Sequence, residues 1–106
     1  MKIRFMSVAE LPIKIDRERI AEFCSARGIR KLSVFGSVLR DDFDPVRSDV
    51  DVLVELSPDT KAGLAYFGWG EELSQIIGLK VDLCSRLNRH IEDEVRREAV
   101  TVYEQA

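Results

Sequence analysis

The chain has 106 residues, of which 45% are hydrophobic and 33% charged, and its formal net charge at pH 7 is −3. This balance predicts one globular domain over residues 1–106, without room for a second substrate-binding lobe, and the absence of any signal-peptide pattern predicts a cytoplasmic location. No apolar run approaches the roughly 20 residues that span a membrane, and the acidic balance argues against stable nucleic-acid binding, which depends on basic surfaces.

One helix is predicted in the first quarter of the chain, after a segment of unknown role. Residues 1–15 are mostly apolar and contain Pro12, so we expect a short edge strand or an extended arm. A helix is predicted over residues 16–27, with Asp16 as its N-cap and Gly28 just beyond its end. Its apolar positions recur at helical spacing: Ile20, Phe23 and Cys24.

A strand, a corner and a polar loop follow. Residues 31–35 are predicted to form the first strand, and Gly36-Ser37 turns the chain into a short helical segment that ends at Arg40. Residues 41–48 are polar and include a proline, which predicts an exposed, mobile loop. The loop acids are interpreted as surface charges and not as ligands: Asp41, Asp42 and Asp44.

A second strand, a long helix and a third strand are expected next. The strands are predicted over residues 50–56 and 80–84, and the helix over residues 61–77. Two glycines make a kink or break at Gly68-Trp69-Gly70 plausible, because each costs about 1 kcal/mol relative to alanine. Trp69 is interpreted as a core residue and not as a platform that stacks on adenine. The apolar stripe of this helix comprises Ala65, Trp69, Leu73, Ile76 and Ile77.

The last segment, residues 85–106, is predicted to form a mixed-charge amphipathic helix. His90, the only histidine, lies near its start without a second His or Cys at ligand spacing and is interpreted as a surface residue. Cys24 and Cys84 are expected to be packed free thiols and not a disulfide, given the cytoplasmic assignment. The apolar positions of this helix are Ile91, Val95, Ala99 and Val102.

Two carboxylates one residue apart open the second strand. Because strand side chains alternate, Asp49 and Asp51 project from one face, and the valines at positions 50, 52 and 54 project from the other. Two like charges ~4 Å apart repel by roughly 4 kcal/mol at an effective dielectric of ~20, so a cation is expected between them. Carboxylate oxygens suit Mg²⁺ or Mn²⁺, which is often bound together with substrate phosphates.

A third acid, Asp82, lies in the middle of the third strand, on the face opposite Val81 and Leu83. An unpaired charge inside a short apolar strand is strongly disfavoured. A salt bridge to a nearby Lys or Arg would satisfy Asp82, but a third carboxylate beside Asp49 and Asp51 favours a metal site.

Phosphate binding is predicted at Gly36-Ser37. A glycine at the end of a strand lets the backbone approach a ligand closely, and backbone N–H groups at a following helix start attract anions. Ser37 adds a hydroxyl donor.

Gly36-Ser37, eleven intervening residues and Asp49-Val50-Asp51 resemble the Gly-Ser-x-Asp-x-Asp signature of the superfamily that includes DNA polymerase beta, in particular the minimal nucleotidyltransferases. The loop looks one residue longer than is usual in that family, around residues 44–47. The resemblance covers about residues 11–103. It implies an α/β (α+β) nucleotidyltransferase fold, a small mixed β-sheet flanked by helices, and Asp82 matches the family's third acid.

The resemblance also implies roles for the site residues, with ATP as the substrate and two Mg²⁺ ions, or Mn²⁺, as cofactors. The metal ligands and catalytic residues would be Asp49, Asp51 and Asp82. The nucleotide-binding residues would be Gly36, Ser37, Arg40 and Ser48, although Arg40 fits a solvated arginine equally well.

Minimal nucleotidyltransferases of this kind are similar to the antitoxin half of bacterial toxin–antitoxin pairs, whose partner is an all-helical HEPN ribonuclease toxin. The resemblance implies a hetero-oligomer in which the antitoxin transfers AMP from ATP to a toxin tyrosine and so neutralises the toxin. Two alternatives stay open: transfer to a small molecule such as an aminoglycoside with a helical partner subunit, and a non-catalytic antitoxin that inhibits by occlusion. Three mutually repelling acids favour catalysis, because a pure binder does not need them.

Overall fold

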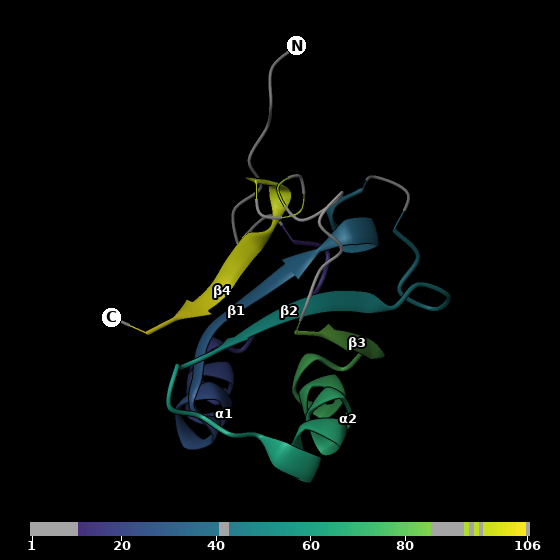
Figure 1. The fold of residues 1–106 in the computed structure, drawn as a ribbon. Helices are drawn as coiled ribbons and strands as arrows, with labels where there is room; N and C mark the ends of the chain where they lie inside the picture. The colour runs from purple at the N-terminus through teal and green to yellow at the C-terminus, as the bar shows by residue number, and fades with distance from the viewer. Residues whose placement is uncertain (1–10, 41–42, 86–92, 94, 96, 106) are drawn as a thin grey trace.

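The computed structural model describes residues 11–40, 43–85, 93, 95 and 97–105. Four strands form one sheet in the order β3-β2-β1-β4, in which β1 runs antiparallel to β2 and β4, and β2 runs parallel to β3 (Figure 1). The predicted small mixed sheet with flanking helices is therefore confirmed. In chain order the elements are α1 (Arg17–Arg27), β1 (Ile29–Phe35), η2 (Gly36–Leu39), β2 (Val50–Leu56), η3 (Gly63–Ala65), α2 (Tyr66–Ile77), β3 (Val81–Cys84) and β4 (Val100–Glu104).

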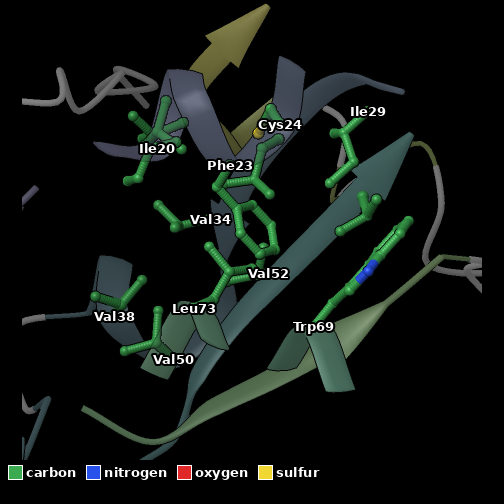
Figure 2. Close-up of a cluster of buried hydrophobic side chains, with 14 of the residues drawn as sticks. Ile20, Phe23, Cys24, Ile29, Val34, Val38, Val50, Val52, Trp69 and Leu73 are labelled. Carbon is green, nitrogen blue, oxygen red and sulfur yellow. The ribbon is translucent and has the colours of Figure 1, made fainter. Parts of the chain in front are cut away.

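Both long helices, α1 and α2, pack on the same face of the sheet (Figure 1). The core lies between them and the strands, and Figure 2 shows Phe23 of α1 and Trp69 of α2 meeting there edge to face, with ring centroids 6.4 Å apart. Trp69 is only 4% exposed, so its assignment to the core is confirmed. The alternating valines of β2 are also buried as predicted: Val50, Val52 and Val54.

The predicted caps delimit α1. The Asp16 carboxylate accepts a hydrogen bond from the Arg19 backbone N–H at 3.2 Å, which satisfies one of the free donors of the first turn. Gly28 adopts a left-handed conformation (φ 69°) and its N–H donates to the Cys24 carbonyl, which is how a glycine ends a helix. Both cysteines are free thiols as predicted, and burial raises the pKa of Cys24 to about 12.

The starts of β1 and of the long helix differ most from the prediction, whereas α1 and β3 each begin one residue later than predicted. β1 begins two residues earlier, at Ile29, because that side chain is buried and its backbone pairs with Leu56. The long helix begins later: η3 leads into α2, which starts at Tyr66 and continues through Gly68 and Gly70 without a break. Tertiary packing of Trp69 therefore outweighs the cost of its two flanking glycines.

The prediction of one C-terminal helix was wrong in its last part. Asp93, Val95, Arg97 and Glu98 are helical, but Val100–Glu104 forms β4, which pairs with β1. The predictions for His90 and Ile91 lie outside the described residues.

The N-terminal segment was predicted to be an edge strand or an extended arm. Residues 11–15 form no strand, so the edge strand is wrong for this part, and Leu11 packs into the core. Residues 1–10 lie outside the described range. No helix within the described ranges is long and apolar enough to cross a membrane.

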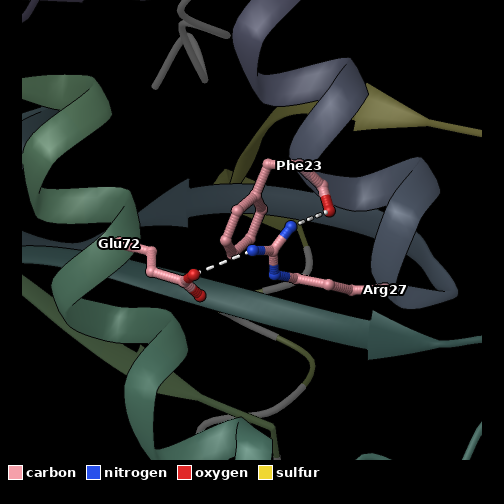
Figure 3. A network of polar contacts seen from close by, with 3 residues as sticks. All are labelled: Phe23, Arg27 and Glu72. Carbon is pink, nitrogen blue, oxygen red and sulfur yellow. Dashed lines mark hydrogen bonds and ion pairs between the residues drawn. The ribbon is translucent and has the colours of Figure 1, made fainter.

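Arg27 connects the two helices across the top of the core (Figure 3). Its guanidinium carbon lies 4.1 Å from the centroid of the Phe23 ring, and one nitrogen donates to the Phe23 carbonyl at 3.0 Å. A second nitrogen pairs with the Glu72 carboxylate of α2 at 2.9 Å. The planar guanidinium makes all three contacts at once, which an ammonium group cannot do.

Arg27→Ala is expected to lower the free energy of unfolding by about 1–2 kcal/mol, because a cation–π contact and a part-exposed ion pair each contribute about 0.5–1 kcal/mol. Arg27→Lys should recover less than half of that loss. Urea unfolding of both variants, with Glu72→Gln to isolate the ionic part, measures these values. An Arg27→Lys variant as stable as the wild type would contradict the role given to the guanidinium plane.

Candidate active site

Asp51 and Asp82 lie side by side on the sheet face opposite the helices. The two residues are register partners in the parallel pair of β2 and β3, and register partners project from the same face. The valines that flank Asp51 are fully buried on the helix side, so the aspartate itself points to the other side. Asp49 directly precedes β2, close enough for its charge to act on Asp51. The structure thus places Asp51 beside Asp82, with Asp49 just before the same strand, and the shared metal site of the three acids stays a prediction.

The environment of Asp51 raises the pKa of its carboxyl above the usual value. Burial is the largest cause, and the neighbouring charge of Asp82 is the next. A hydrogen bond from the Ser37 backbone N–H and the positive charge of Arg40 oppose this shift, and the charge of Asp49 adds to it. Asp51 is therefore the acid whose negative charge costs most in the absence of a cation.

Gly36 packs directly against Asp51. Phe35 and Asp51 are register partners, so Gly36, the residue after Phe35, lies next to the Asp51 carboxylate. A Cβ at position 36 would overlap an oxygen of Asp51, and Gly36 also has a left-handed backbone conformation (φ 75°). Glycine is required here for both reasons, conformation and space.

Ser37 links the corner to the acid pair. Its hydroxyl donates to the Asp49 carbonyl at 3.2 Å, and its backbone N–H bonds to the Asp51 carboxylate. Sequence reasoning expected this hydroxyl to face a phosphate, whereas in the structure it holds the start of β2 against η2. The corner and the acids are thus fixed relative to each other before any ligand binds.

The other two predicted nucleotide-binding residues lie at the rim. Arg40 is exposed at the end of η2, within electrostatic reach of Asp51. Ser48 is half-buried just before the acids, and its backbone N–H bonds to the Asp44 carbonyl at 2.8 Å.

Asp44 organises the turn that precedes the acids. Its carboxylate accepts a hydrogen bond from the Val46 N–H at 2.9 Å and lies 3.8 Å from the Arg47 guanidinium. Val46 is 90% exposed, which agrees with the exposed loop that the sequence predicts. The predictions for Asp41 and Asp42 lie outside the described residues.

Sequence reasoning missed one residue of this face, Cys84. Strand alternation places it on the same side as Asp82, and it pairs in register with Leu53. Burial, Asp82 and Asp51, in that order, raise the pKa of its thiol. The signal was present in the sequence, because Cys84 follows Asp82 by two residues in a strand.

The donor set fits a hard divalent cation. Within the ranges that the structure describes, no group of three or more His, Cys, Asp or Glu side chains is arranged to hold a metal ion by itself. The site instead offers carboxylate oxygens on an open face, one of them with a raised pKa that a nearby cation would lower. Such an arrangement suits Mg²⁺, which keeps several waters and takes further oxygen ligands from substrate phosphates.

Residues 17–103 match the family model of the nucleotidyltransferase domain. The chain belongs to this family. The Gly36-Ser37 corner and the acids on β2 and β3 all lie within the matched range. A search of curated proteins gives no match for this nucleotidyltransferase.

Solved structures of similar fold include a protein described as a minimal nucleotidyltransferase. It is 30% identical in sequence, and the two structures superpose with a TM-score of 0.59 over 79% of this chain and 86% of that one. A toxin–antitoxin structure with AMP-PNP is 17% identical, with a TM-score of 0.65 over 86% of this chain and 75% of that one. A mutant of the toxin–antitoxin MntA-HpeT has the same TM-score and coverages at 15% identity. At these identities, the two toxin–antitoxin structures establish the fold alone.

The raised pKa of Asp51 predicts how stability depends on pH. In buffer with EDTA, the folded chain keeps the Asp51 proton to a higher pH than the unfolded chain, in which the pKa of this carboxyl is near 3.8. The free energy of unfolding is therefore expected to fall as the pH rises from the Asp51 pKa of the unfolded chain to that of the folded chain. Above the pKa of the folded chain, Asp51 should cause no further loss. Urea unfolding between about pH 4 and 8, with Asp51→Asn as the reference, measures this. The advantage of Asp51→Asn over the wild type should grow with pH, and a constant difference would contradict the prediction.

Proposed function

We propose that this nucleotidyltransferase transfers AMP from ATP to a tyrosine hydroxyl of an all-helical HEPN ribonuclease toxin and so acts as the antitoxin. The observation that carries the proposal is the setting of Asp51, which lies against Gly36, is bonded by the Ser37 N–H and is in register with Asp82. The similarity in fold to toxin–antitoxin structures, one of them with AMP-PNP, supports the choice of nucleotide and partner.

In the proposed reaction the acceptor oxygen attacks the α-phosphorus of ATP. The bond from that phosphorus to the bridging oxygen breaks, and pyrophosphate leaves with the electron pair. The Gly36 backbone at the corner holds the β- and γ-phosphates so that the leaving group is in line, while Ser37 keeps the corner in place through its bonds to Asp49 and Asp51. Asp82, the exposed acid of the three, lies nearest the incoming acceptor and takes up its proton.

Two divalent cations, Mg²⁺ or Mn²⁺, would be held by Asp49, Asp51 and Asp82; when bound, they neutralise the triphosphate and lower the pKa of the acceptor hydroxyl. Asp49 and Asp51 are half-buried, whereas Asp82 is exposed. This gradient lets a nucleotide rest against β1 and β2 while a second molecule approaches over β3. We therefore infer a hetero-oligomer with the toxin, in the cytoplasm.

The test is to incubate the chain with ATP, Mg²⁺ and the purified product of the neighbouring gene, and to measure the intact mass of that product. The expected result is the mass gain of AMP on a tyrosine, lost in an Asp49→Asn, Asp51→Asn double variant. No gain with the wild type would refute transfer to the partner. Protection of cells by the double variant would indicate inhibition by occlusion, and label transfer from ATP only when a small hydroxyl compound is added would indicate a small-molecule acceptor.

A further inference from the structure

β3 is the edge strand of the sheet, and no other described strand pairs with its outer side. Its inner side faces β2, where the Val50 N–H donates to the Lys80 carbonyl at 2.8 Å. In the register of this parallel pair, the backbone N–H and C=O of Asp82 also face β2. The backbone groups of Val81 and Leu83 therefore point outward. The Val81 N–H donates to the Ser74 hydroxyl oxygen at 2.9 Å. Among the described residues nothing pairs with the Val81 carbonyl or with the N–H and C=O of Leu83.

A groove of about 450 Å³ runs between β3 and α2, and its lining is mainly apolar but also includes Glu71, Ser74 and Lys80. Its walls include Leu83 and the aromatic rings of Tyr66 and Phe67, and Phe67 is 79% exposed. Gly70 keeps the groove wide, because a Cβ there would lie 3.8 Å from both the Leu83 Cβ and the Val81 carbonyl oxygen. Figure 1 shows β3 at the margin of the sheet with α2 beside it.

We propose that the acceptor protein docks by adding an extended segment to the outer edge of β3, with the acceptor tyrosine on the face of Asp82. This inference rests on the proposed function and names the form in which its substrate is presented. In a complex, a loop or tail of the helical partner in extended conformation can pair with the open groups of Val81 and Leu83, whereas a docked helix has already used its own backbone groups. The residues that alternate with the tyrosine point to the other face and insert into the groove beside Phe67.

The register of β3 explains how such a segment would serve the reaction. A strand added to β3 lies about 4.8 Å from Asp82 and twice that from Asp51. A short serine side chain on that strand stops at the edge of the site, whereas the longer tyrosine can extend across β3 toward Asp51. The geometry therefore selects a tyrosine on an extended segment over a serine in the same place.

Two glycines of α2 provide matched variants. Gly70→Leu places a side chain over the groove and the Val81 carbonyl, whereas Gly68→Leu makes the same change where a Cβ meets nothing within 4 Å. The two positions are about 200° apart around the helix, and both changes improve helix propensity. Gly70→Ala, whose Cβ makes only ordinary contacts, controls for any effect of substitution at this position.

The experiment measures binding of the purified neighbouring-gene product to each variant by calorimetry, together with amide exchange at Leu83 by NMR. Gly70→Leu is expected to weaken binding and AMP transfer at least about tenfold, with Gly68→Leu and Gly70→Ala unchanged. In the wild-type complex, exchange at Leu83 N–H should slow by about tenfold or more.

Equal binding by Gly70→Leu and Gly68→Leu, or an unchanged exchange rate at Leu83 in the complex, would overturn docking at β3 even if AMP transfer proceeds. Binding with protection of Leu83 but without any mass gain would uphold the docking site and refute the proposed transfer. The two ideas therefore fail on separate readouts.

Discussion

Asp51→Asn is expected to lower the rate of AMP transfer by on the order of 10³-fold or more while leaving the chain folded and, without metal, more stable. Asparagine keeps the shape and can still accept the hydrogen bond from the Ser37 N–H, but it removes the charge that Asp82 and Asp49 repel. Removing this repulsion is expected to raise the free energy of unfolding of the metal-free chain. A loss of activity together with a gain in stability is the signature of a functional acid.

Intact-mass measurement of the partner gives the activity, and urea unfolding gives the stability. Asp59→Asn is the matched control, because Asp59 is an exposed acid in the turn after β2; it should change neither quantity. Retention of more than about a tenth of the activity by Asp51→Asn would remove this residue from the reaction.

Gly36→Ala is expected to lower both the stability of the chain and its activity. A left-handed backbone costs an alanine about 1–2 kcal/mol, and the overlap of its Cβ with the Asp51 carboxylate adds about 1–3 kcal/mol. The methyl group would also push the acid away from its partners, and displacements of this size near reacting atoms cost about 10²-fold in rate.

Gly63→Ala separates the two causes. Gly63 also has a positive φ of 56°, but a Cβ there meets nothing within 4 Å, so this variant measures backbone strain alone. Gly36→Ala should lose more stability than Gly63→Ala, and only Gly36→Ala should lose activity. Equal stability and full activity in both variants would show that the contact between Gly36 and Asp51 is unimportant.

Local signals were sufficient to predict much of the fold. Asp16 and Gly28 delimit α1 because caps act over a single turn, and the alternation around Asp51 determines which face of β2 is buried. The C-terminal strand was missed because Val95, Ala99 and Val102 also fit helical spacing. Val100 and Val102 are β-branched and alternate, but only the open edge of β1 decides in favour of a strand.

The site was predictable as a set of residue types but not as a set of contacts. The alternation of side chains indicated which faces the acids share. The packing of Gly36 on Asp51 depends on the register between β1 and β2, which no local pattern determines. The use of the Ser37 hydroxyl as a tie to Asp49 has the same origin, because it joins residues on either side of a loop.

That tie separates the position of the acids from the exposed surface of the loop. Since Ser37 holds the start of β2 and Asp44 closes the turn over residues 44–48, neither contact uses the side chain of Val46. A substitution of that side chain, which belongs to a residue that is 90% exposed, should therefore leave the chemistry intact. A dye attached to a cysteine at this position would report nucleotide arrival from a position beside the reaction.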